Sequence, residues 1–238
     1  MARVHDGPHD VKRALVVRHH VEDDAGLIGR ALVRRGYQLE TTLIDATHPS
    51  PTSWEADVVV VLGANSSVYD SEVQERWLNA ELNALHEIAN AQVPILGICF
   101  GAQMLCHLFG GTVQRAANEE VGWFDVEVVA DVALPRGPWF EHHHDCCTLP
   151  PTAEIWARTA LAVQAFAIGR HVGVQFHPEI EEEQLARWFA STSDVGRASS
   201  ERESALLAET RRQTPSAAVR AQQLVDLFLR HGAVDHNR

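Results

Sequence analysis

The chain has 238 residues, and its 32 Asp and Glu outnumber its 20 Lys and Arg, which gives a formal net charge of −12 at pH 7. This acidic balance argues against nucleic acid and an anionic membrane surface as partners, because both select clustered basic side chains. No apolar stretch approaches the roughly 20 residues of a membrane span. Residues 1–10 lack the apolar core of a signal peptide.

The chain has four cysteines, too few for a disulfide framework, and none of them belongs to a Cys-x-x-Cys pair. A reducing, cytoplasmic setting fits this usage best. We expect residues 1–10 to be flexible and residues 11–238 to form a single domain, since no linker-like composition divides the chain. The sequence leaves self-association into a homo-oligomer open.

In the first half of the chain, short apolar runs alternate with stretches whose apolar residues recur at helical spacing. The run Val58–Val61 is apolar throughout, which is typical of a strand buried on both faces. This alternation predicts a doubly wound α/β sheet of mostly parallel strands, with ligands bound beyond the carboxyl ends of the strands. The predicted strands cover residues 14–17, 37–44, 58–62 and 94–98, and the predicted helices cover residues 25–35, 72–90 and 103–109.

The second half contains short strand patterns, several of them separated by turns that contain Gly or Pro. They indicate an antiparallel extension at one edge of the sheet. Helices are predicted over residues 181–190 and 215–229, with a mobile polar loop over residues 191–201 and a further helical stretch, 203–212, that joins the last helix. The predicted strands cover residues 112–114, 123–129, 155–158, 163–168 and 171–176.

The segment Gly97-Ile98-Cys99-Phe100-Gly101 places a thiol in a sharp turn between a strand and a helix. Gly-x-Cys-x-Gly is the cysteine counterpart of the Gly-x-Ser-x-Gly nucleophile elbow, in which the flanking glycines let the chain turn tightly enough to expose a reactive atom. A buried structural cysteine is the commoner fate of a free thiol. The position of Cys99 at the end of an apolar strand favours the reactive role.

A thiol with a reference pKa of about 8.5 needs a base within hydrogen-bond reach and a third group to orient that base. The chain has 14 histidines, so their number selects none of them. His177 is selected by its place at the end of an apolar strand, just before Pro178. Glu179 lies two residues further along, on the same face of an extended chain. The three side chains fit the logic of a catalytic triad.

The sequence Pro-Ile-Leu-Gly-Ile-Cys-Phe-Gly-Ala-Gln at 94–103, together with Gly-Val-Gln-Phe-His-Pro-Glu at 173–179, closely resembles the class I, triad-type glutamine amidotransferases. The resemblance extends over nearly the whole chain after residue 11. The overall pattern is most similar to stand-alone proteins related to the glutaminase half of GMP synthase. The resemblance implies a flavodoxin-like fold and an enzyme that uses no cofactor and no metal.

The resemblance also implies a role for each matching residue. Cys99 would attack the side-chain amide of L-glutamine and form a γ-glutamyl thioester with release of ammonia. His177 would carry the protons, and Glu179 would orient His177. The oxyanion would be held by the backbone N–H of Phe100 and by that of Gly63 or its neighbour.

One departure from the family pattern lies in the oxyanion loop, which usually reads Gly-Gly-Pro before a serine and here reads Gly63-Ala64-Asn65-Ser66. Ala64 lacks the freedom of glycine at positive φ, so we expect a loop that is less preorganised in the free protein. Asn65 retains the N–H that proline lacks. Ala64 and Asn65 are candidate substrate-binding residues, as is Gln103, which matches the family position that contacts glutamine.

A second departure is His142-His143-His144-Asp145, where the family often has Trp-His-Gly-Asp. His142, His144 and Asp145 are candidate substrate-binding residues, and His143 stands in the family's histidine position. His144 replaces a glycine, which would reshape the pocket. The consecutive histidines also suggest a metal site, but adjacent residues of an extended segment point to opposite faces, so we expect no metal here.

Three functions compete. The first is a glutaminase that supplies ammonia to a partner synthetase, since the chain carries no nucleotide-binding P-loop of its own. The second is a hydrolase of γ-glutamyl amides or peptides, which the altered loops at residues 64–65 and 142–145 motivate. The third is a binding or regulatory protein without turnover, and the intact Cys99, His177 and Glu179 count against it.

Overall fold

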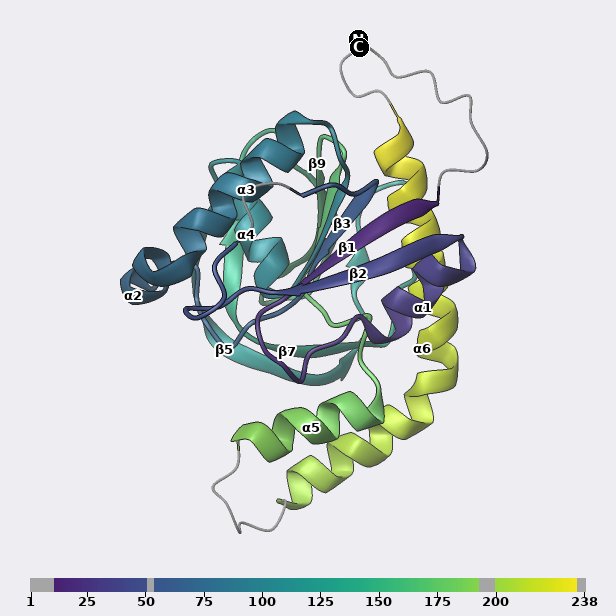
Figure 1. The fold of residues 1–238 in the computed structure, drawn as a ribbon. Helices are drawn as coiled ribbons and strands as arrows, with labels where there is room; N and C mark the ends of the chain where they lie inside the picture. The colour runs from purple at the N-terminus through teal and green to yellow at the C-terminus, as the bar shows by residue number, and fades with distance from the viewer. Residues whose placement is uncertain (1–10, 51–53, 193–199, 235–238) are drawn as a thin grey trace.

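An eight-stranded mixed sheet forms the centre of the computed structural model, which describes residues 11–50, 54–192 and 200–234 (Figure 1). Five strands run parallel in the order β2-β1-β3-β4-β10, and β9, β8 and β6 continue the sheet in antiparallel fashion. The predicted flavodoxin-like, doubly wound sheet with an antiparallel edge is therefore confirmed. The strands are β1 (Lys12–Arg18), β2 (Tyr37–Leu43), β3 (Val58–Val61), β4 (Ile95–Ile98), β6 (Glu127–Val128), β8 (Glu154–Arg158), β9 (Val163–Ile168) and β10 (His171–Val174).

Helices cover both faces of the sheet, and β3 explains why. Its four valines are fully buried, and they alternate between two cores: Val58 and Val60 face one, while Val59 and Val61 face the other. Figure 1 shows α1 and α6 on the first face and α3 and α4 on the second. The helices are α1 (Gly26–Arg34), α2 (Ser71–Val73), the π-helical η1 (Gln74–Leu78), α3 (Asn79–Asn90), α4 (Phe100–Leu108), α5 (Glu182–Thr192) and α6 (Glu201–Ala233).

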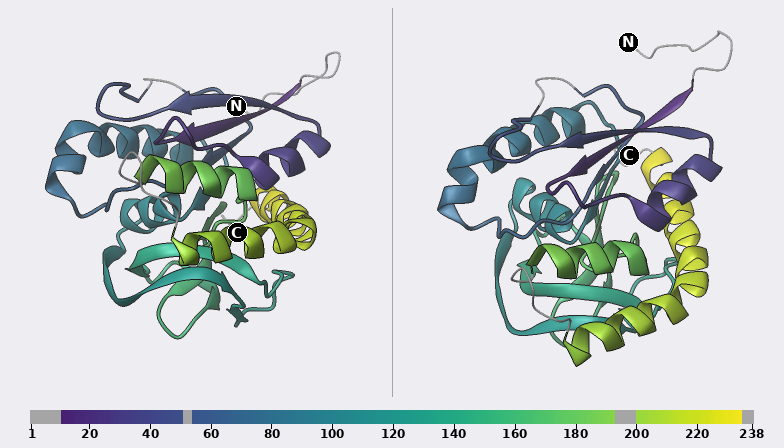
Figure 2. Two further views of the ribbon diagram at one scale, coloured as in Figure 1. Left: turned by 90° about the horizontal axis from the view of Figure 1, so that it is seen from below. Right: turned by 60° about the horizontal axis from the view of Figure 1, so that its bottom comes forward.

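A separate two-stranded antiparallel sheet, β5 (Thr112–Phe124) with β7 (Trp139–Thr148), lies beyond the end of the main sheet where the parallel strands finish, and α5 lies near it (Figures 1 and 2). The prediction that residues 112–114 and 123–129 add to the edge of the main sheet is wrong for β5, because β5 pairs with β7 instead. The polar, histidine-rich sequence of β7 carries no apolar strand signal, so its pairing with β5 has no local signature.

Two helix predictions also need correction. The single helix predicted over residues 72–90 contains a π-helical turn, η1, since the spacing of apolar residues does not distinguish one π turn from an α turn. The stretches 203–212 and 215–229 join, as predicted, but in one helix of 33 residues that runs through Pro215. Figure 2 shows α6 changing direction along its length, as a proline inside a helix causes.

Some predictions fall outside the described residues: the flexible segment 1–10 and most of the loop 191–201. Ser200 begins α6 with a capping box, accepting from the N–H of Glu203 while the Glu203 carboxylate accepts from the N–H of Ser200. Within the described part of the chain, none of the helices has the length and hydropathy needed to span a bilayer.

Candidate active site

Cys99 occupies the sharp turn between β4 and α4. Its φ of 52° lies in a region that residues other than glycine rarely adopt. Its N–H donates to the carbonyl oxygen of Val174 at 2.8 Å, which ties the turn to β10. A Cβ on Gly101 would lie 2.3 Å from the carbonyl oxygen of Val61, and one on Gly97 would lie 2.5 Å from the backbone of Gly101. The glycines on both sides of the thiol are therefore required by close backbone approach.

His177 follows the neighbouring strand, β10, and its ring is held on one side. Its Nδ1 donates to Oε1 of Glu179 at 2.8 Å, and its backbone N–H donates to the carbonyl oxygen of Phe140 at 2.7 Å. Both side chains of the His177–Glu179 pair are almost fully buried. Nε2 of His177 is also buried and makes no hydrogen bond to any described residue. This nitrogen is the one available to exchange a proton with Cys99.

The electrostatics of the pair favour a protonated imidazole. Burial opposes the charged form of His177, but the negative charge of Glu179, together with the adjacent Cys99, outweighs it and holds the pKa of His177 well above its usual range. The indole of Trp188 packs edge-on against the same ring, with centroids 5.1 Å apart. The structure thus brings together Cys99, His177 and Glu179, the three residues that the sequence proposes as a triad.

The loop after β3, for which the sequence predicts an oxyanion-binding role, lies against this pair. A Cβ on Gly63 would lie 3.2 Å from Cε1 of His177 and 3.7 Å from Cβ of Cys99. The carbonyl oxygen of Gly63 accepts from Nδ1 of His19 at 2.9 Å. Ala64 does not adopt positive φ, since Gln92 and Cys99 are the non-glycine residues that do so in the described part of the chain. In this conformation the alanine at position 64 therefore causes no backbone strain.

His19 is a buried support for this loop that the sequence did not reveal. Its Nε2 lies 3.2 Å from each carboxylate oxygen of Glu81 on α3, and both side chains are almost fully buried. Burial opposes the charged imidazolium, but the charge of Glu81 outweighs it and raises the pKa of His19. Its ring also packs against Trp77 of η1 and against Phe100, with centroids 5.2 Å apart in both cases.

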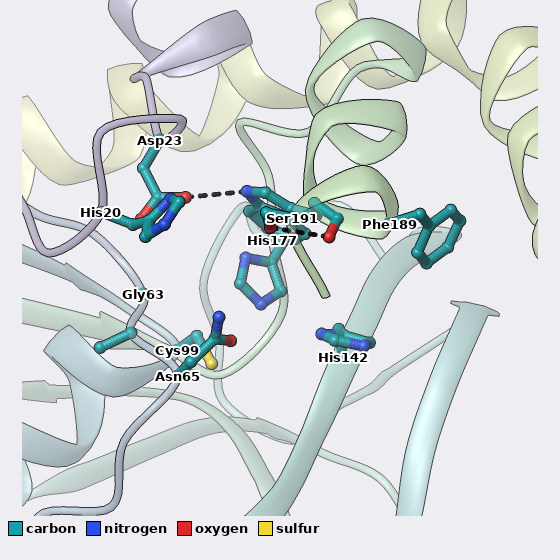
Figure 3. A pocket seen from close by; sticks show the side chains of 11 residues that line it. His20, Asp23, Gly63, Asn65, Cys99, His142, His177, Phe189 and Ser191 are labelled. Carbon is teal, nitrogen blue, oxygen red and sulfur yellow. Dashed lines mark hydrogen bonds between the residues drawn. The ribbon is translucent and has the colours of Figure 1, made fainter. Parts of the chain in front are cut away.

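Two cavities meet at Cys99. The first, of about 90 Å³, is drawn in Figure 3, where Cys99, Asn65 and His177 lie between Asp23 and His20 on one side and His142 and Phe189 on the other. The second, of about 120 Å³, opens toward α4 and β7. The first is lined by His20, Asp23, Gly63, Ala64, Asn65, Cys99, His142, His177, Trp188, Phe189 and Ser191, and the second by Ala64, Asn65, Ser66, Cys99, Phe100, Gln103, Glu119, Val121, His142, His143, His144 and Asp145.

Gln103 and Asp145, two of the candidate substrate-binding residues, lie in the wall of the second cavity. The amide of Gln103 donates to Oε1 of Gln175 at 3.3 Å, and its own Oε1 is buried without a partner among the described residues. Asp145 accepts from the hydroxyls of Ser67 at 2.7 Å and Tyr69 at 2.8 Å. Asp145 therefore fastens the loop that follows β3 to β7, a role that the motif alone did not indicate.

The histidine run on β7 alternates as an extended chain requires, with His142 and His144 exposed and His143 buried. Although part of the His142 side chain is exposed, desolvation by the surrounding protein lowers its pKa to about 4, and the charge of His177 adds to this effect. Nε2 of His144 lies 3.7 Å from Oδ1 of Asp145. Among the described residues, no group of three or more His, Cys, Asp or Glu side chains is placed to hold a metal ion.

His143 instead joins a buried network of carboxylates. Its Nδ1 donates to the carbonyl oxygen of Asp145 at 3.0 Å, and its Nε2 lies 3.2 Å from Glu120 and 3.3 Å from Glu141. Burial opposes the charge, but the two carboxylates outweigh it and raise the pKa of His143 to about 10. Burial raises the pKa of Glu141 to about 7. His143 therefore places a positive charge in the wall of the second cavity, which Cys99 also lines.

Comparison with known proteins identifies a family whose model covers this site. The model of the family "Glutamine amidotransferase class-I" matches residues 24–189, which include Cys99, His177 and Glu179. A GMP synthase [glutamine-hydrolyzing] from Thermomicrobium roseum is 32% identical over 152 residues, which cover 58% of this chain and 27% of that protein. One from Thermosipho melanesiensis is 27% identical over 181 residues, covering 73% of this chain and 34% of that protein. The match thus spans about a third of these relatives' length or less.

Solved structures match the chain over nearly its whole length. A glutamine amidotransferase from Thermotoga maritima has a TM-score of 0.80 and 26% sequence identity, and the match covers 95% of this chain and 100% of that one. A glutamine amido transferase from Methylobacillus flagellatus has a TM-score of 0.76 at 19% identity, covering 96% and 98% of the two chains. The second of these likenesses concerns the fold alone.

Proposed function

Because the chain belongs to the class-I glutamine amidotransferase family, we propose that it hydrolyses the side-chain amide of L-glutamine to glutamate and ammonia through a thioester on Cys99. The observation that carries this proposal is the placement of His177, which Glu179 holds through Nδ1 while Nε2 is left for the thiol of Cys99. Nucleophile, base and orienting acid occupy one buried corner at the carboxyl ends of β4 and β10.

In the first step the thiol proton moves to Nε2 of His177, and the sulfur of Cys99 attacks the amide carbon of glutamine. The raised pKa of His177 supports this transfer, because it stabilises the imidazolium that forms. The imidazolium then donates its proton to the departing nitrogen. The carbon–nitrogen bond breaks, ammonia leaves and the γ-glutamyl group remains on sulfur.

In the second step a water molecule takes the place of ammonia. The neutral His177 accepts a proton from the water, whose oxygen attacks the thioester carbon. The carbon–sulfur bond breaks, glutamate leaves and the proton on the imidazole returns to the sulfur of Cys99. The sum is one glutamine and one water converted to one glutamate and one ammonia.

Both tetrahedral intermediates place negative charge on the former amide oxygen. The N–H of Phe100, at the start of α4, is one donor, and the loop at Gly63 and Ala64 supplies the second. The hold of His19 on the Gly63 carbonyl supports this loop as the second donor, because it aims the following N–H away from His19. A single such donor is worth about 2.7–4 kcal/mol of barrier.

The glutamyl part of the substrate is assigned to the second cavity. The unpartnered Oε1 of Gln103 supports this assignment, because an ammonium group is a natural donor for a buried acceptor. His142, His144 and Asp145 line the same cavity and complete the candidate binding set, together with Ala64 and Asn65, which line both cavities.

The ammonia is proposed to serve a synthetase active site on another polypeptide. Two relatives are named GMP synthase [glutamine-hydrolyzing], and this chain matches about a third of their length or less. Self-association of the chain is compatible with this arrangement.

Steady-state ammonia release from free glutamine tests the proposal, with Cys99→Ala as the control for background. We expect release from the wild type that Cys99→Ala abolishes, and a covalent adduct on Cys99 with a glutamine-like diazoketone, detected by mass spectrometry. Absence of both, with the protein alone and with candidate synthetases, would refute the proposal.

A second candidate keeps the thioester chemistry and changes the leaving group to an amine larger than ammonia. The specific observation in its favour is the first cavity, which lies on the His177 side of Cys99 and is walled by aromatic side chains.

A further inference from the structure

The two cavities at Cys99 accommodate different halves of the substrate, the γ-glutamyl group and the amine that leaves. His177 lines the first cavity but not the second, while Phe100 and Gln103 line the second but not the first. A general acid must reach the nitrogen that it protonates, so the leaving group lies on the side of His177. The oxyanion donor Phe100 lies on the side of the acyl group. The first cavity is therefore the place from which the amine half of the substrate departs.

The size of this cavity exceeds what ammonia requires. A cavity of about 10–15 Å³ is enough to hold one water molecule, which is similar in size to ammonia. The cavity holds about 90 Å³. The remaining space accommodates a short chain of carbon atoms attached to the departing nitrogen.

The walls of the cavity indicate the chemistry of that chain. Nε1 of Trp188 donates to Oδ1 of Asp23 at 2.8 Å, so an indole ring and a carboxylate are fixed side by side in the wall, and Figure 3 shows Asp23 beside His20. Asp23 is 8% exposed, and Phe189 adds a second aromatic wall. A carboxylate beside aromatic rings suits a positively charged nitrogen, which both attract. The same carboxylate would repel the carboxylate of an amino-acid leaving group.

We propose that the first cavity is a leaving-group site for γ-glutamyl amides whose amine carries a second, positively charged nitrogen, that is, for γ-glutamyl diamines. The inference rests on the proposed thioester chemistry at Cys99. The γ-glutamyl carbon forms a bond to sulfur, its bond to the amide nitrogen breaks, and His177 gives that nitrogen its proton. Water then releases glutamate, so one γ-glutamyl diamine and one water give glutamate and a free diamine.

Three substrates whose amines each contain four carbon atoms test the effect of the terminal charge. They are the γ-glutamyl amides of butylamine, of 1,4-diaminobutane and of 4-aminobutyrate, which end in a methyl group, an ammonium and a carboxylate. We expect kcat/KM to be about tenfold higher for the diaminobutane amide than for the butylamide, and lowest for the aminobutyrate amide. Glutamine, measured beside them, reports on the thioester chemistry alone.

Two substitutions in the first cavity test which side chains produce the preference for a positively charged amine. Asp23→Asn should bring the ratio of diaminobutane amide to butylamide to within about threefold, because it removes the attracting carboxylate. Trp188→Phe keeps an aromatic wall without the N–H and should lower the ratio less. Glu87→Gln, which removes an exposed carboxylate on α3 outside the cavity, should leave the ratio unchanged.

Binding to Cys99→Ala by calorimetry gives a second measurement in the absence of turnover, and it should rank the three amides in the same order. Cleavage of glutamine without cleavage or binding of any of the amides would overturn this inference and leave the proposed function standing. Amide cleavage with no preference for the ammonium would overturn the charge assignment. Failure to cleave glutamine and all amides, with no adduct on Cys99, would refute the proposed function itself.

Discussion

The imidazole of His19 holds the carbonyl oxygen of Gly63 at 2.9 Å. Because a carbonyl oxygen only accepts, Nδ1 carries the proton, and Nε2 faces the carboxylate of Glu81 at 3.2 Å. The C=O and the following N–H of a trans peptide point in opposite directions, so this contact fixes the direction of the N–H of Ala64. A buried pair, with His19 just after β1 and Glu81 on α3, thus sets the geometry of the loop beside Cys99.

Removing this contact should slow turnover more than it weakens substrate binding. We expect His19→Ala to lower kcat for glutamine by about 10- to 100-fold and to leave KM within about threefold, because a displaced loop loses part of one oxyanion donor. Steady-state ammonia release at varied glutamine concentration measures both constants.

His19→Asn is the matched control, because its amide N–H can take the place of Nδ1 while the contact with Glu81 is lost. It should recover most of the kcat that His19→Ala loses. Thermal unfolding of both variants separates a misplaced loop from a damaged fold. Equal losses of kcat in the two variants, or a rise in KM alone, would contradict a role in aiming the loop.

The network of His143 with Glu120 and Glu141 should make stability depend on pH. The folded pKa values of Glu141, about 7, and His143, about 10, lie above the ordinary values of 4.5 and 6.5. Their contributions are therefore fully present at low pH and are lost as pH rises, from about 4.5 to 7 for Glu141 and from about 6.5 to 10 for His143. We expect the Tm to fall from about pH 6 to pH 9, measured by calorimetry.

Glu141→Gln tests this assignment, since it removes the buried charge and leaves Glu120 to pair with His143. The variant should gain stability relative to the wild type as pH rises from about 4.5 to 7, by on the order of 1 kcal/mol, and keep this gain at higher pH. Glu87→Gln, on the exposed side of α3, should follow the wild type at every pH. A constant difference between Glu141→Gln and the wild type would argue against a buried, titrating Glu141.

The triad candidates could be proposed from sequence because each lies in a contiguous motif. Cys99 is flanked by glycines that the backbone requires, and Glu179 lies two residues from His177, which suffices to place both on one side. The parallel sheet could also be predicted from a contiguous pattern, because the all-valine strand β3 indicates a strand that is buried on both faces.

The supporting residues could not be predicted, because they come from separate elements that only the fold brings together. His19 lies in a polar stretch that gives no sign of burial, and its partner Glu81 stands 62 residues away. Asp23 and Trp188 meet across 165 residues. Neither pair leaves a pattern in the local sequence that predicts its contact, and the polar strand β7 has no local pattern that predicts its pairing with β5.

The turn at Cys99 should not tolerate a methyl group on its second glycine. Gly101→Ala places a Cβ 2.3 Å from the carbonyl oxygen of Val61, so α4 must move away from β3. We expect a loss of about 2–4 kcal/mol in the free energy of unfolding, measured by urea titration, with a large loss of turnover. Gly110→Ala meets no atom within 4 Å and carries only the strain of its φ of 88°, so it should cost roughly 1 kcal/mol. Equal losses in the two variants would contradict a tight contact at Gly101.

The negative charge of Glu179 should determine how strongly His177 holds its proton. Glu179→Gln keeps an acceptor for Nδ1 but removes the negative charge that raises the pKa of His177, so that pKa should fall. The balance between thiolate with imidazolium and thiol with imidazole then shifts toward the neutral pair. We expect kcat/KM for glutamine to fall by about 10²- to 10⁴-fold, with slower alkylation of Cys99 by iodoacetamide at neutral pH.

The neighbouring acid provides the control for this change. Glu181→Gln removes a carboxylate two residues away that pairs with Arg30 rather than with His177, and it should leave both rates near those of the wild type. Alkylation tests the proton balance without requiring turnover, so a loss of activity with unchanged alkylation would mean that Glu179 acts only by holding the ring in place. A parallel loss of both rates is expected, because a single charge sets the proton balance between Cys99 and His177 on which each rate depends.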